Sequence, residues 1–433
     1  MKILYTTFLE LPFNSGIYDS QVKTLLFTLK KKYAQELDLH LSINIGFAYL
    51  GRRNSEIVFK KYRKDCECLI AECAKKGVRV KVNYLFLPLL KRHSFHLNSV
   101  LLPLMILISF PIYFVNVIRV KPDIIHCRSY PATLMAVFAK LIWKKAKIIF
   151  DMRGLYPEEG IAHGRWKEDS VAFKMWKCIE KILLKKSERI IVLSDPFKKY
   201  VGLLSNEYES KISYIAASID KIFFEKNENN NKKIRSKLGL ENKKVFVSHG
   251  SLNYWHSPRV LAEIFIEINK IMEKAFLMIL TTYDKKKFAN ILKFCGIDDT
   301  KYYISFVPFI DIPKYLAAAD YAIIPSADLE FEKRKCTKVI LDTMIGLKVS
   351  ECMGAGLPLI ANENIGGLKY IMDSNNLGVT FGLGKKENYG EKIRYLENNY
   401  ERISKRCKEY ARDHLDVEVN AEKYFEIYKM LHK

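Results

Sequence analysis

The sequence predicts an α/β protein made of two doubly wound domains that face a central cleft. The chain has 433 residues, which is long for a single core. Short apolar stretches typical of buried strands alternate with helical patterns along nearly all of it. A polar segment around residues 216–244 interrupts this alternation, and the pattern then restarts at KKVFVSHGSL. We therefore place the first domain at residues 1–216 and the second at residues 217–412.

The composition indicates a folded protein of a reducing compartment. Apolar residues make up 49% of the chain, which is too many for a disordered tail. The nine cysteines are scattered and odd in number, which argues against a disulfide framework and favours the cytoplasm. Cys66, Cys68 and Cys73 form a cluster, but no second ligand pair follows, so we predict no metal site. The chain enters a strand at MKILYTT, so we expect no signal peptide.

The net charge of +23 is concentrated in the first half of the chain. Residues 1–220 hold 36 Lys and Arg against 20 Asp and Glu, and the remainder holds 35 against 28. A basic surface suits nucleic acid, an anionic membrane or an anionic substrate, and it also arises when a protein simply uses Lys heavily. We find no recognition helix, zinc finger or aromatic platform motif, so we predict no nucleic-acid partner. Basic patches beside apolar helices favour an anionic lipid surface instead.

The first domain opens with a strand over residues 1–8 and a loop in which Gly16 permits a tight turn into a helix. Residues 100–118 form the one stretch that is apolar enough to cross a membrane. Two prolines interrupt this stretch, and a crossover helix is required here, so we expect a helix that is buried or docked on a membrane surface. A basic stretch at residues 91–93 precedes it and would help it rest on a bilayer.

Two successive strands deliver charged side chains to the same predicted edge of the first sheet. KPDIIHCRS ends in His126 and Arg128, and KAKIIFDMRG ends in Asp151 and Arg153. Open α/β sheets bind ligands beyond the carboxyl ends of their strands. We expect Asp151 and Arg153 to be functional, whereas a buried structural histidine is an equal alternative for His126.

The second domain repeats this arrangement. The strand KKVFVSH runs into a Gly250-Ser251 turn, and a helix begins near Pro258 with Arg259 in its first turn. Such a turn can hold a diphosphate, although a plain tight turn explains it equally well. AFLMILTTY, KYYISFVPF, ADYAIIPS and LPLIAN supply four more strands, and residues 400–433 have an amphipathic helical pattern.

The stretch from Gly346 to Gly367 has the most specific pattern of the second domain. It reads as a loop, a short helix, a Gly-Ala-Gly stop, a buried strand and a second glycine-rich turn. Lys348 and Glu351 lie three residues apart and therefore share one helix face. A helix N-terminus with a nearby Lys is a phosphate site, and Glu351 can accept hydrogen bonds from sugar hydroxyls. The stretch predicts a nucleotide pocket, with an ordinary solvated helix–strand unit as the alternative.

Taken in order, these motifs resemble those of the GT-B glycosyltransferases, and in particular the retaining, nucleotide-sugar-dependent glycosyltransferase family 4. The resemblance covers nearly the whole chain. It rests on SGIYDSQV, KPDIIHCRS, DMRGLYPEEG, LLKKSERIIVLSD, SHGSL, DIPKYLAAADYAIIPS and KVSECMGAGLPLIANENIGG. The last segment and the DMRG segment are the most specific. The resemblance implies two Rossmann-like domains, with a final helix at residues 413–433 that returns to the first domain.

The resemblance also implies roles for individual residues. Glu351 would hold the ribose of the donor, and backbone amides from Met344 to Lys348, a segment that includes Gly346 and Leu347, would hold its phosphates. Gly250 and Ser251 would lie beside the diphosphate. Gly16 would face the sugar and the acceptor. The acceptor side would be lined by groups at the ends of the two strands, namely His126, Arg128 and Asp151.

The chain departs from the family pattern at one position. The family's Glu-x7-Glu motif pairs Glu351 with a Glu eight residues earlier, where this chain has Thr343. In the family that Glu contacts the transferred sugar, so its absence leaves the sugar and the stereochemistry open. Asp342 is adjacent and is a candidate to compensate. Many relatives also carry a Lys-Gly pair after the SHGSL-type turn, and Arg259 is the candidate to supply that charge here.

The predicted activity is transfer of a hexosyl group from a nucleotide diphosphate sugar to an acceptor hydroxyl, without a metal or a cofactor. Lys348, Arg259 and helix N-termini would stabilise the departing diphosphate. If the reaction inverts, Asp151 is the candidate base. We expect a lipid-linked glycan of the cell envelope as acceptor, and a cytoplasmic enzyme that associates with the inner face of the membrane. The alternatives are a nucleotide-sugar epimerase, an inactive membrane-bound scaffold and a nucleic-acid-binding module.

Overall fold

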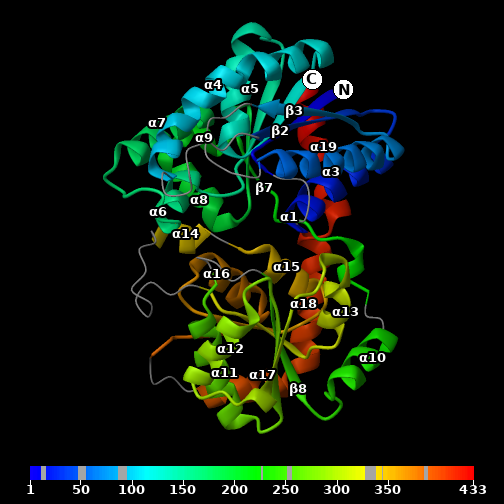
Figure 1. Ribbon diagram of the computed structural model, residues 1–433, viewed down its shortest axis with the longest axis vertical. Coiled ribbons are helices and arrows are strands. Elements are labelled where there is room, and N and C mark those ends of the chain that lie inside the picture. Colours follow the sequence, from blue (N-terminus) through cyan, green and yellow to red (C-terminus); the bar gives the residue numbers. More distant parts are fainter. Residues whose placement is uncertain are drawn as a thin grey trace. The chain divides into compact units, whose positions relative to one another are not determined.

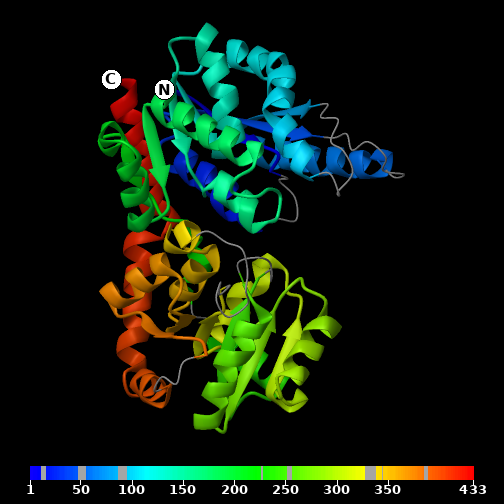
Figure 2. The same ribbon diagram turned by 90° about the vertical axis from the view of Figure 1, so that its left-hand side faces the viewer.

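The computed structural model describes residues 1–10, 16–46, 55–85, 95–225, 228–250, 256–326, 338–343, 345–384 and 389–433. These residues form two compact units (Figure 1). Unit 1 comprises Met1–Ala216 together with Val417–Lys433, and unit 2 comprises Ala217–Asp416. The two ends of the chain lie close together in unit 1 (Figures 1 and 2).

Unit 1 is built on a seven-stranded parallel sheet in the order β3-β2-β1-β4-β5-β6-β7. Its strands are β1 (Lys2–Phe8), β2 (Asp38–Gly46), β3 (Arg79–Leu85), β4 (Ile124–Arg128), β5 (Lys147–Asp151), β6 (Arg189–Val192) and β7 (Ile212–Tyr214). The strand order reverses direction at β1, and right-handed crossovers then place helices on both faces of the sheet. Arg128 pairs with Asp151 in the register of β4 and β5, so these two residues reach the same edge of the sheet.

The helices of unit 1 fill the crossovers of this sheet. They are α1 (Gly16–Tyr18), the π-helical turn η1 (Asp19–Lys23), α2 (Thr24–Lys32), α3 (Ser55–Lys75), α4 (Phe95–Val120), α5 (Ser129–Ile142), α6 (Tyr156–Ala162), α7 (Val171–Lys186), α8 (Asp195–Leu204), α9 (Asn206–Glu209) and the last helix α19 (Val417–His432). Helix α19 packs on α2, where the rings of Tyr33 and Phe425 stack at 3.6 Å.

Helix α4 contains the apolar stretch at residues 100–118. It runs unbroken through both Pro103 and Pro111. On its inner face, Tyr113 Oη lies 3.1 Å from Thr6 Oγ1, and Asn116 Nδ2 donates to Ser42 Oγ at 3.0 Å. Residues Val100–Val120 are long and apolar enough to cross a membrane, yet 39% of the most apolar window is buried inside unit 1. The helix is therefore part of the core of unit 1 on one face.

Unit 2 is built on a six-stranded parallel sheet in the order β10-β9-β8-β11-β12-β13. Its strands are β8 (Lys244–His249), β9 (Ala275–Leu280), β10 (Tyr302–Ser305), β11 (Tyr321–Ile324), β12 (Leu359–Asn362) and β13 (Gly378–Phe381). Its α-helices are α10 (Glu228–Leu238), α11 (Pro258–Ile271), α12 (Lys285–Phe294), α13 (Ile312–Ala317), α14 (Lys338–Thr343), α15 (Leu347–Gly354), α16 (Gly366–Asn375), α17 (Tyr389–Asn398) and α18 (Tyr400–His414). Short 3-10 turns lie at η3 (Lys221–Phe223), η4 (Asp299–Lys301) and η5 (Phe309–Asp311).

The predicted fold class is confirmed: each unit is a doubly wound α/β domain with a parallel sheet. Two short strands, β7 and β13, were missed because they have only three and four residues and lie at the edges of their sheets. The polar segment near residue 228 is not wholly irregular, since α10 forms there. The amphipathic end of the chain forms two helices, since α18 ends and α19 begins where the chain passes from unit 2 to unit 1.

Candidate functional site

The turn after β8 is shaped to receive a lysine side chain. Gly250 has φ +96°, a conformation that favours glycine. A Cβ added to Gly250 would lie 2.2 Å from Lys348 Cε and 2.8 Å from Lys348 Nζ. The Gly250 amide also donates to Leu280 O at 2.7 Å, which fixes the turn against the end of β9. The lysine therefore lies directly against the backbone of Gly250 at the carboxyl edge of the sheet.

Helix α15 brings the predicted nucleotide residues to this edge. Gly346 is its N-cap residue with extended backbone angles, and no side chain caps the helix there. Leu347 and Lys348 form its first turn. A helix N-terminus without a side-chain cap is the kind of helix end that binds phosphate groups. Glu351, one turn further on, is only 4% exposed.

Burial shifts the pKa values of Lys348, Glu351 and His249 around this turn. It lowers the pKa of Lys348 to about 7, even though Glu351 acts in the opposite direction. It raises the pKa of Glu351 to about 8, opposed by Lys348. His249 Nε2 lies 3.5 Å from Glu351 Oε2, but burial and Lys348 lower the pKa of His249 to about 3. That histidine is neutral, so the contact is not an ion pair at physiological pH.

Two buried histidines at this edge were not predicted as site residues. His249 ends β8, and His256 forms an isolated bridge with Ser326. Burial lowers the pKa of His256 well below its usual range, and Lys348 lowers it further. His256 Nδ1 and His249 Nε2 have no hydrogen-bond partner among the described residues. The signal for His249 was its place at the end of an apolar strand, directly before the Gly250 turn.

The positions expected to contact the sugar adopt different arrangements. Thr343 ends α14 and donates its hydroxyl to its own helix, at Val339 O (2.9 Å), so its side chain is engaged locally. Asp342 faces the start of α16 instead, since a Cβ added to Gly366 would lie 2.5 Å from Asp342 Oδ1. The carboxylate of Asp342 therefore lies beside the first residue of α16.

Arg259 lies in the first turn of α11 and is exposed. Burial raises the pKa of the Cys295 thiol and Arg259 lowers it, so the guanidinium faces the end of α12. The charges that shift the pKa of Lys348 come from Glu351 and Cys352. Arg259 is thus not among the charges that act on Lys348. The predicted Ser251 and Met344 lie outside the described residues.

A pocket of about 450 Å³ lies at the same carboxyl edge, beyond β9 and β10. It begins at Thr281, the residue after the one whose carbonyl binds the Gly250 amide. Two aromatic rings line it, those of Tyr283 and Phe306, which are 37% and 65% exposed. Aromatic rings beside threonine hydroxyls and a lysine, Lys285, suit a flat, polar ring system. The sequence did not single out this pocket.

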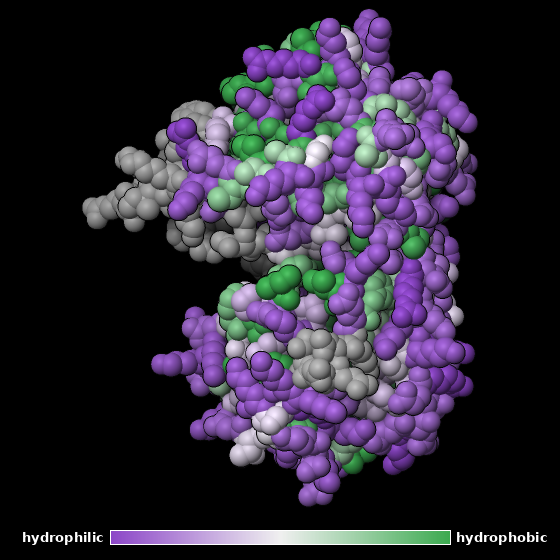
Figure 3. Space-filling model, turned by 90° about the vertical axis from the view of Figure 1, so that its right-hand side faces the viewer, coloured by the Kyte–Doolittle hydropathy of each residue, from purple (hydrophilic) through white to green (hydrophobic). Residues whose placement is uncertain are grey.

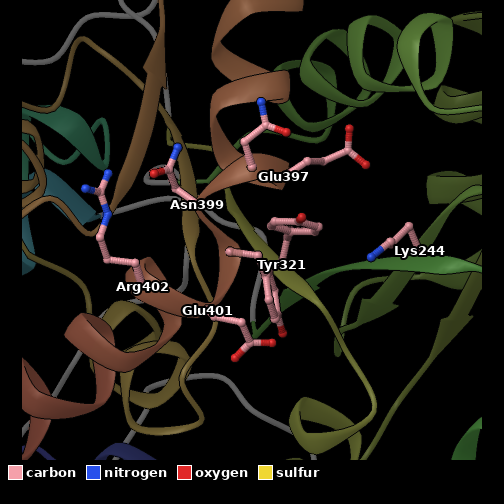
Figure 4. A pocket seen from close by; sticks show the side chains of 8 residues that line it. Lys244, Tyr321, Glu397, Asn399, Glu401 and Arg402 are labelled. Carbon is pink, nitrogen blue, oxygen red and sulfur yellow. The ribbon is translucent and has the colours of Figure 1, made fainter.

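A second pocket of about 500 Å³ lies at the opposite, amino edge of the sheet in unit 2 (Figure 4). Lys244 at the start of β8 and Tyr321 at the start of β11 line it, together with Glu401 and Arg402 of α18. The carboxyl edge is where parallel sheets bind ligands. This second pocket is therefore separate from the predicted nucleotide residues.

In unit 1, the charged residues at the ends of β4 and β5 form one buried network. Arg153 donates to Asp151 Oδ1 at 3.3 Å and to Gln21 Oε1 at 2.6 Å. His126 Nε2 lies 3.5 Å from Asp151 Oδ2, and His126 Nδ1 lies 2.6 Å from Tyr428 Oη on α19. The C-terminal helix thus completes a network that begins at the N-terminal end of the chain.

The carboxylate of this network is held as an anion. Burial alone would raise the pKa of Asp151, but Arg153 and His126 bring it down to about 2. Its side chain is 1% exposed. A carboxylate this acidic and this enclosed does not readily accept a proton near neutral pH. Burial lowers the pKa of His126, opposed by Asp151.

Arg128 and Tyr5 each carry a buried polar atom with no hydrogen-bond partner in the part of the chain that the structure describes. Arg128 Nε donates to Glu10 Oε2 at 2.7 Å. Burial acts to lower the pKa of the arginine, but Glu10, Tyr5 and Asp151 together raise it. Arg128 Nη1 and Tyr5 Oη are buried without a hydrogen-bond partner among the described residues. Gly16 starts α1, and its carbonyl accepts from Ser20 Oγ at 2.7 Å. Within the described ranges, no group of three or more His, Cys, Asp or Glu side chains is placed to hold a metal ion.

The second unit matches a known protein family. Residues 230–414, which lie within unit 2, match the family model described as "Glycosyl transferases group 1". No curated protein sequence matches the chain.

Solved structures match the chain over nearly its full length. A glycosyltransferase from Rickettsia africae is 16% identical with a TM-score of 0.68, and the match covers 100% of this chain and 98% of that one. HepE from Anabaena, solved with UDP and glucose, is 14% identical with a TM-score of 0.65 and 99% coverage of both chains. Sucrose-phosphate synthase from Thermosynechococcus elongatus is 13% identical with a TM-score of 0.68, covering 99% and 98%. Identities this low show the fold alone, and that fold is GT-B, as the resemblance predicted.

Proposed function

We propose that the protein is a glycosyltransferase that moves a sugar from a nucleotide diphosphate sugar to an acceptor hydroxyl. The observation that carries this proposal is the Lys348 side chain against Gly250, beside the uncapped N-terminus of α15. A lysine beside a helix N-terminus supplies positive charge that binds a diphosphate and stabilises it as a leaving group. The match of residues 230–414 to the group 1 family supports the same assignment.

The donor is a UDP-sugar in this proposal, which the UDP complexes of Anabaena HepE support. Glu351 holds the ribose hydroxyls, and the pocket lined by Tyr283 and Phe306 takes the base. Asp342, which lies beside the start of α16, is the candidate to contact the sugar in place of the missing motif Glu. Binding of the diphosphate places negative charge beside Lys348 and restores the ordinary protonated state of its amine.

The chemistry needs neither a metal nor an organic cofactor in this proposal, because Lys348 and the α15 amides supply positive charge to the departing diphosphate. Arg259 remains a candidate for additional charge at the exposed rim. We propose that the reaction retains the anomeric configuration. The acidity and burial of Asp151 support this, since an inverting reaction would require a base on the acceptor side. Arg128, Arg153 and His126 then position the acceptor side of unit 1, with Gly16 at its edge.

The acceptor in this proposal is a lipid-linked glycan of the cell envelope, reached by an enzyme bound peripherally to the inner face of the cytoplasmic membrane. The basic excess of residues 1–220 and the apolar helix α4 support it.

Calorimetry with UDP tests the donor site directly. We expect the wild-type protein to bind UDP and the Glu351→Ala variant to bind it much more weakly. Unchanged affinity in that variant would remove the ribose assignment. Incubation with UDP-sugars, followed by NMR of the products, then tests the reaction. A glycoside with the donor's anomeric configuration supports retention, and interconversion of sugars without an acceptor would point to an epimerase instead.

A further inference from the structure

The outer face of α4 carries a continuous apolar stripe. Its six large apolar side chains are between 38% and 64% exposed. They follow one another at spacings that keep them on one side of a helix. The α4 stripe consists of Leu104, Leu107, Ile108, Ile112, Val115 and Ile118. None of these side chains has a hydrogen-bonding group, so the stripe offers apolar contact and nothing else.

The end of α5 extends this apolar surface. Leu141 and Ile142 are 68% and 60% exposed at the last turn of α5. Trp143 Nε1 donates to Pro122 O at 3.1 Å, which holds the end of α5 close to the end of α4. We call the α4 stripe together with Leu141 and Ile142 the apolar patch. In the space-filling view, hydrophobic side chains also gather on the upper left of unit 1, within a mainly hydrophilic surface (Figure 3).

The surroundings of the apolar patch are basic. Exposed cations lie where the two helices end, at Arg119, Lys121, Lys144, Lys145 and Lys147. Residues 95–147 contain a single acidic residue, Asp123. Its carboxylate accepts from the Lys2 amide at 2.8 Å and lies 3.4 Å from His432 Nε2, so it is engaged within unit 1. An apolar surface with such a flank complements anionic headgroups above acyl chains.

The inner face of α4 excludes a membrane-spanning arrangement. Tyr113 and Asn116 hydrogen-bond to β1 and β2 through Thr6 and Ser42, and Tyr113 and Val117 are fully buried. Pulling the helix across a bilayer would break these bonds and open the core of unit 1. The helix can therefore meet lipid only with its outer face, lying parallel to the membrane plane.

We propose that the apolar patch is the surface by which the protein rests on a membrane that contains anionic lipid. The stripe enters the boundary between headgroups and acyl chains, and the cations at the helix ends contact headgroup phosphates. A second copy of this chain, with its net charge of +23, would bring like charges to the basic flank, whereas anionic headgroups complement it. The inference deepens the proposed function and rests on it for its purpose, because a lipid-linked acceptor lies at that surface.

The test is co-sedimentation of the full chain with vesicles of phosphatidylcholine alone or mixed with phosphatidylglycerol. We expect the wild-type protein to bind the mixed vesicles, and more weakly as salt rises. Leu107→Glu with Ile108→Glu should weaken binding about 10-fold or more, because two inserted side chains become charged. The matched control, Leu203→Glu with Leu204→Glu, changes two exposed leucines at the end of α8 and should bind as the wild type does.

A second pair of variants separates the headgroup contacts from net charge. Lys144→Glu with Lys145→Glu should weaken binding about 10-fold to 30-fold, at roughly 1 kcal/mol for each lysine near the surface. Lys286→Glu with Lys287→Glu in α12 changes the net charge equally at two exposed residues and should have little effect. Equal binding by the patch variants and their controls would overturn the proposal, as would equal binding to both kinds of vesicle.

Two further measurements separate the remaining outcomes. If the wild type self-associates in light scattering, binds no vesicles, and becomes monomeric only in the Leu107/Ile108 variant, the patch is a surface for a second copy and the proposal fails. UDP binding is measured on the same samples by calorimetry. Lipid binding without UDP binding would sink the donor assignment alone, and UDP binding without lipid binding would sink this inference alone.

Discussion

Both units bury charged side chains at the carboxyl edge of their sheets, but the two clusters differ in how charge is balanced. In unit 1, the carboxylate of Asp151 is paired with Arg153, and its pKa falls to about 2. In unit 2, burial drives Lys348 and Glu351 toward their neutral forms, with pKa values of about 7 and 8. A balanced cluster stabilises the empty protein, whereas an unbalanced one destabilises it until a ligand arrives. The contrast supports the proposal that the unit 2 cluster binds a charged ligand, and it predicts that the ion pairs of the unit 1 cluster stabilise unit 1.

The largest expected effect is at the turn that receives the lysine. Gly250→Ala places a methyl group where Lys348 Cε and Nζ now lie, and it strains a residue at φ +96°. We expect UDP affinity to fall about 100-fold or more, since both the lysine and the turn must move. Calorimetry with UDP measures this.

Gly296→Ala is the matched control for that substitution. Gly296 has φ +82°, and a Cβ there would meet nothing within 4 Å, so this variant carries the backbone strain without the clash. We expect it to lose some stability and to keep its UDP affinity. Equal losses of UDP affinity in the two variants would show that displacement of Lys348 is not the cause of the loss.

The next effect separates binding from stability at one residue. In the proposed donor site Glu351 accepts hydrogen bonds from the ribose hydroxyls, and Glu351→Gln replaces this carboxyl group with an uncharged amide, so we expect UDP affinity to fall about 10-fold to 100-fold. The folded-state pKa of Glu351, about 8, lies above the ordinary value of 4.5, so the wild-type carboxyl destabilises the fold increasingly as pH rises through that window. The unliganded variant should therefore be more stable than the wild type, by a margin that grows from pH 5 to pH 8. Thermal unfolding midpoints across that range check the sign, and a margin that shrinks with pH would contradict it.

Much of the fold follows from local pattern. Strand β9 is an uninterrupted apolar run, and β8 contains a shorter one, VFV. Gly346 and Gly354 bracket the helix that was expected between them. The short edge strands β7 and β13 were missed, because three or four residues do not establish a period. The continuity of α4 through two prolines was also not foreseen, since tertiary packing of its inner face outweighs the lost backbone bonds.

The candidate site was predictable only in part. Lys348 and Glu351 were placed on one helix by their spacing, but the fit of the lysine over Gly250 depends on a contact between segments about 100 residues apart. His256 and the pocket beside Phe306 arise from folding and have no local motif. The contribution of α19 to the unit 1 cluster, through Tyr428, is equally non-local. Spacing therefore predicts which groups share an element, and the fold decides which groups meet.

A third prediction concerns the balanced cluster. Asp151→Asn removes a carboxylate whose folded-state pKa is about 2 against an ordinary 3.8, so the wild-type group stabilises the fold above pH 4 and loses this effect as pH falls toward 2. We expect the variant to lose about 2 kcal/mol at pH 7, and the difference to shrink as the pH is lowered. Urea titration followed by tryptophan fluorescence suits this, because Trp143, Trp166 and Trp176 lie in unit 1.

Asp195→Asn is the control for that measurement, since Asp195 is exposed in the same unit. A surface change of this kind should alter stability by no more than about 0.5 kcal/mol. If Asp151→Asn is equally harmless, the unit 1 cluster is not a stabilising network, and its residues become candidates for direct contact with the acceptor.

The smallest expected effect tests whether the two clusters act independently. Tyr428→Phe removes the hydroxyl that lies 2.6 Å from His126 Nδ1 and leaves the ring of α19 in place, so we expect a loss of about 1 kcal/mol in urea titration. Tyr33→Phe, whose ring stacks on Phe425 of the same helix, should change stability less. UDP affinity should be unchanged in both variants, because the residues of the proposed donor site all belong to unit 2. A weakened UDP affinity in Tyr428→Phe alone would show that the unit 1 cluster is coupled to the proposed donor site. The two clusters would then not act independently.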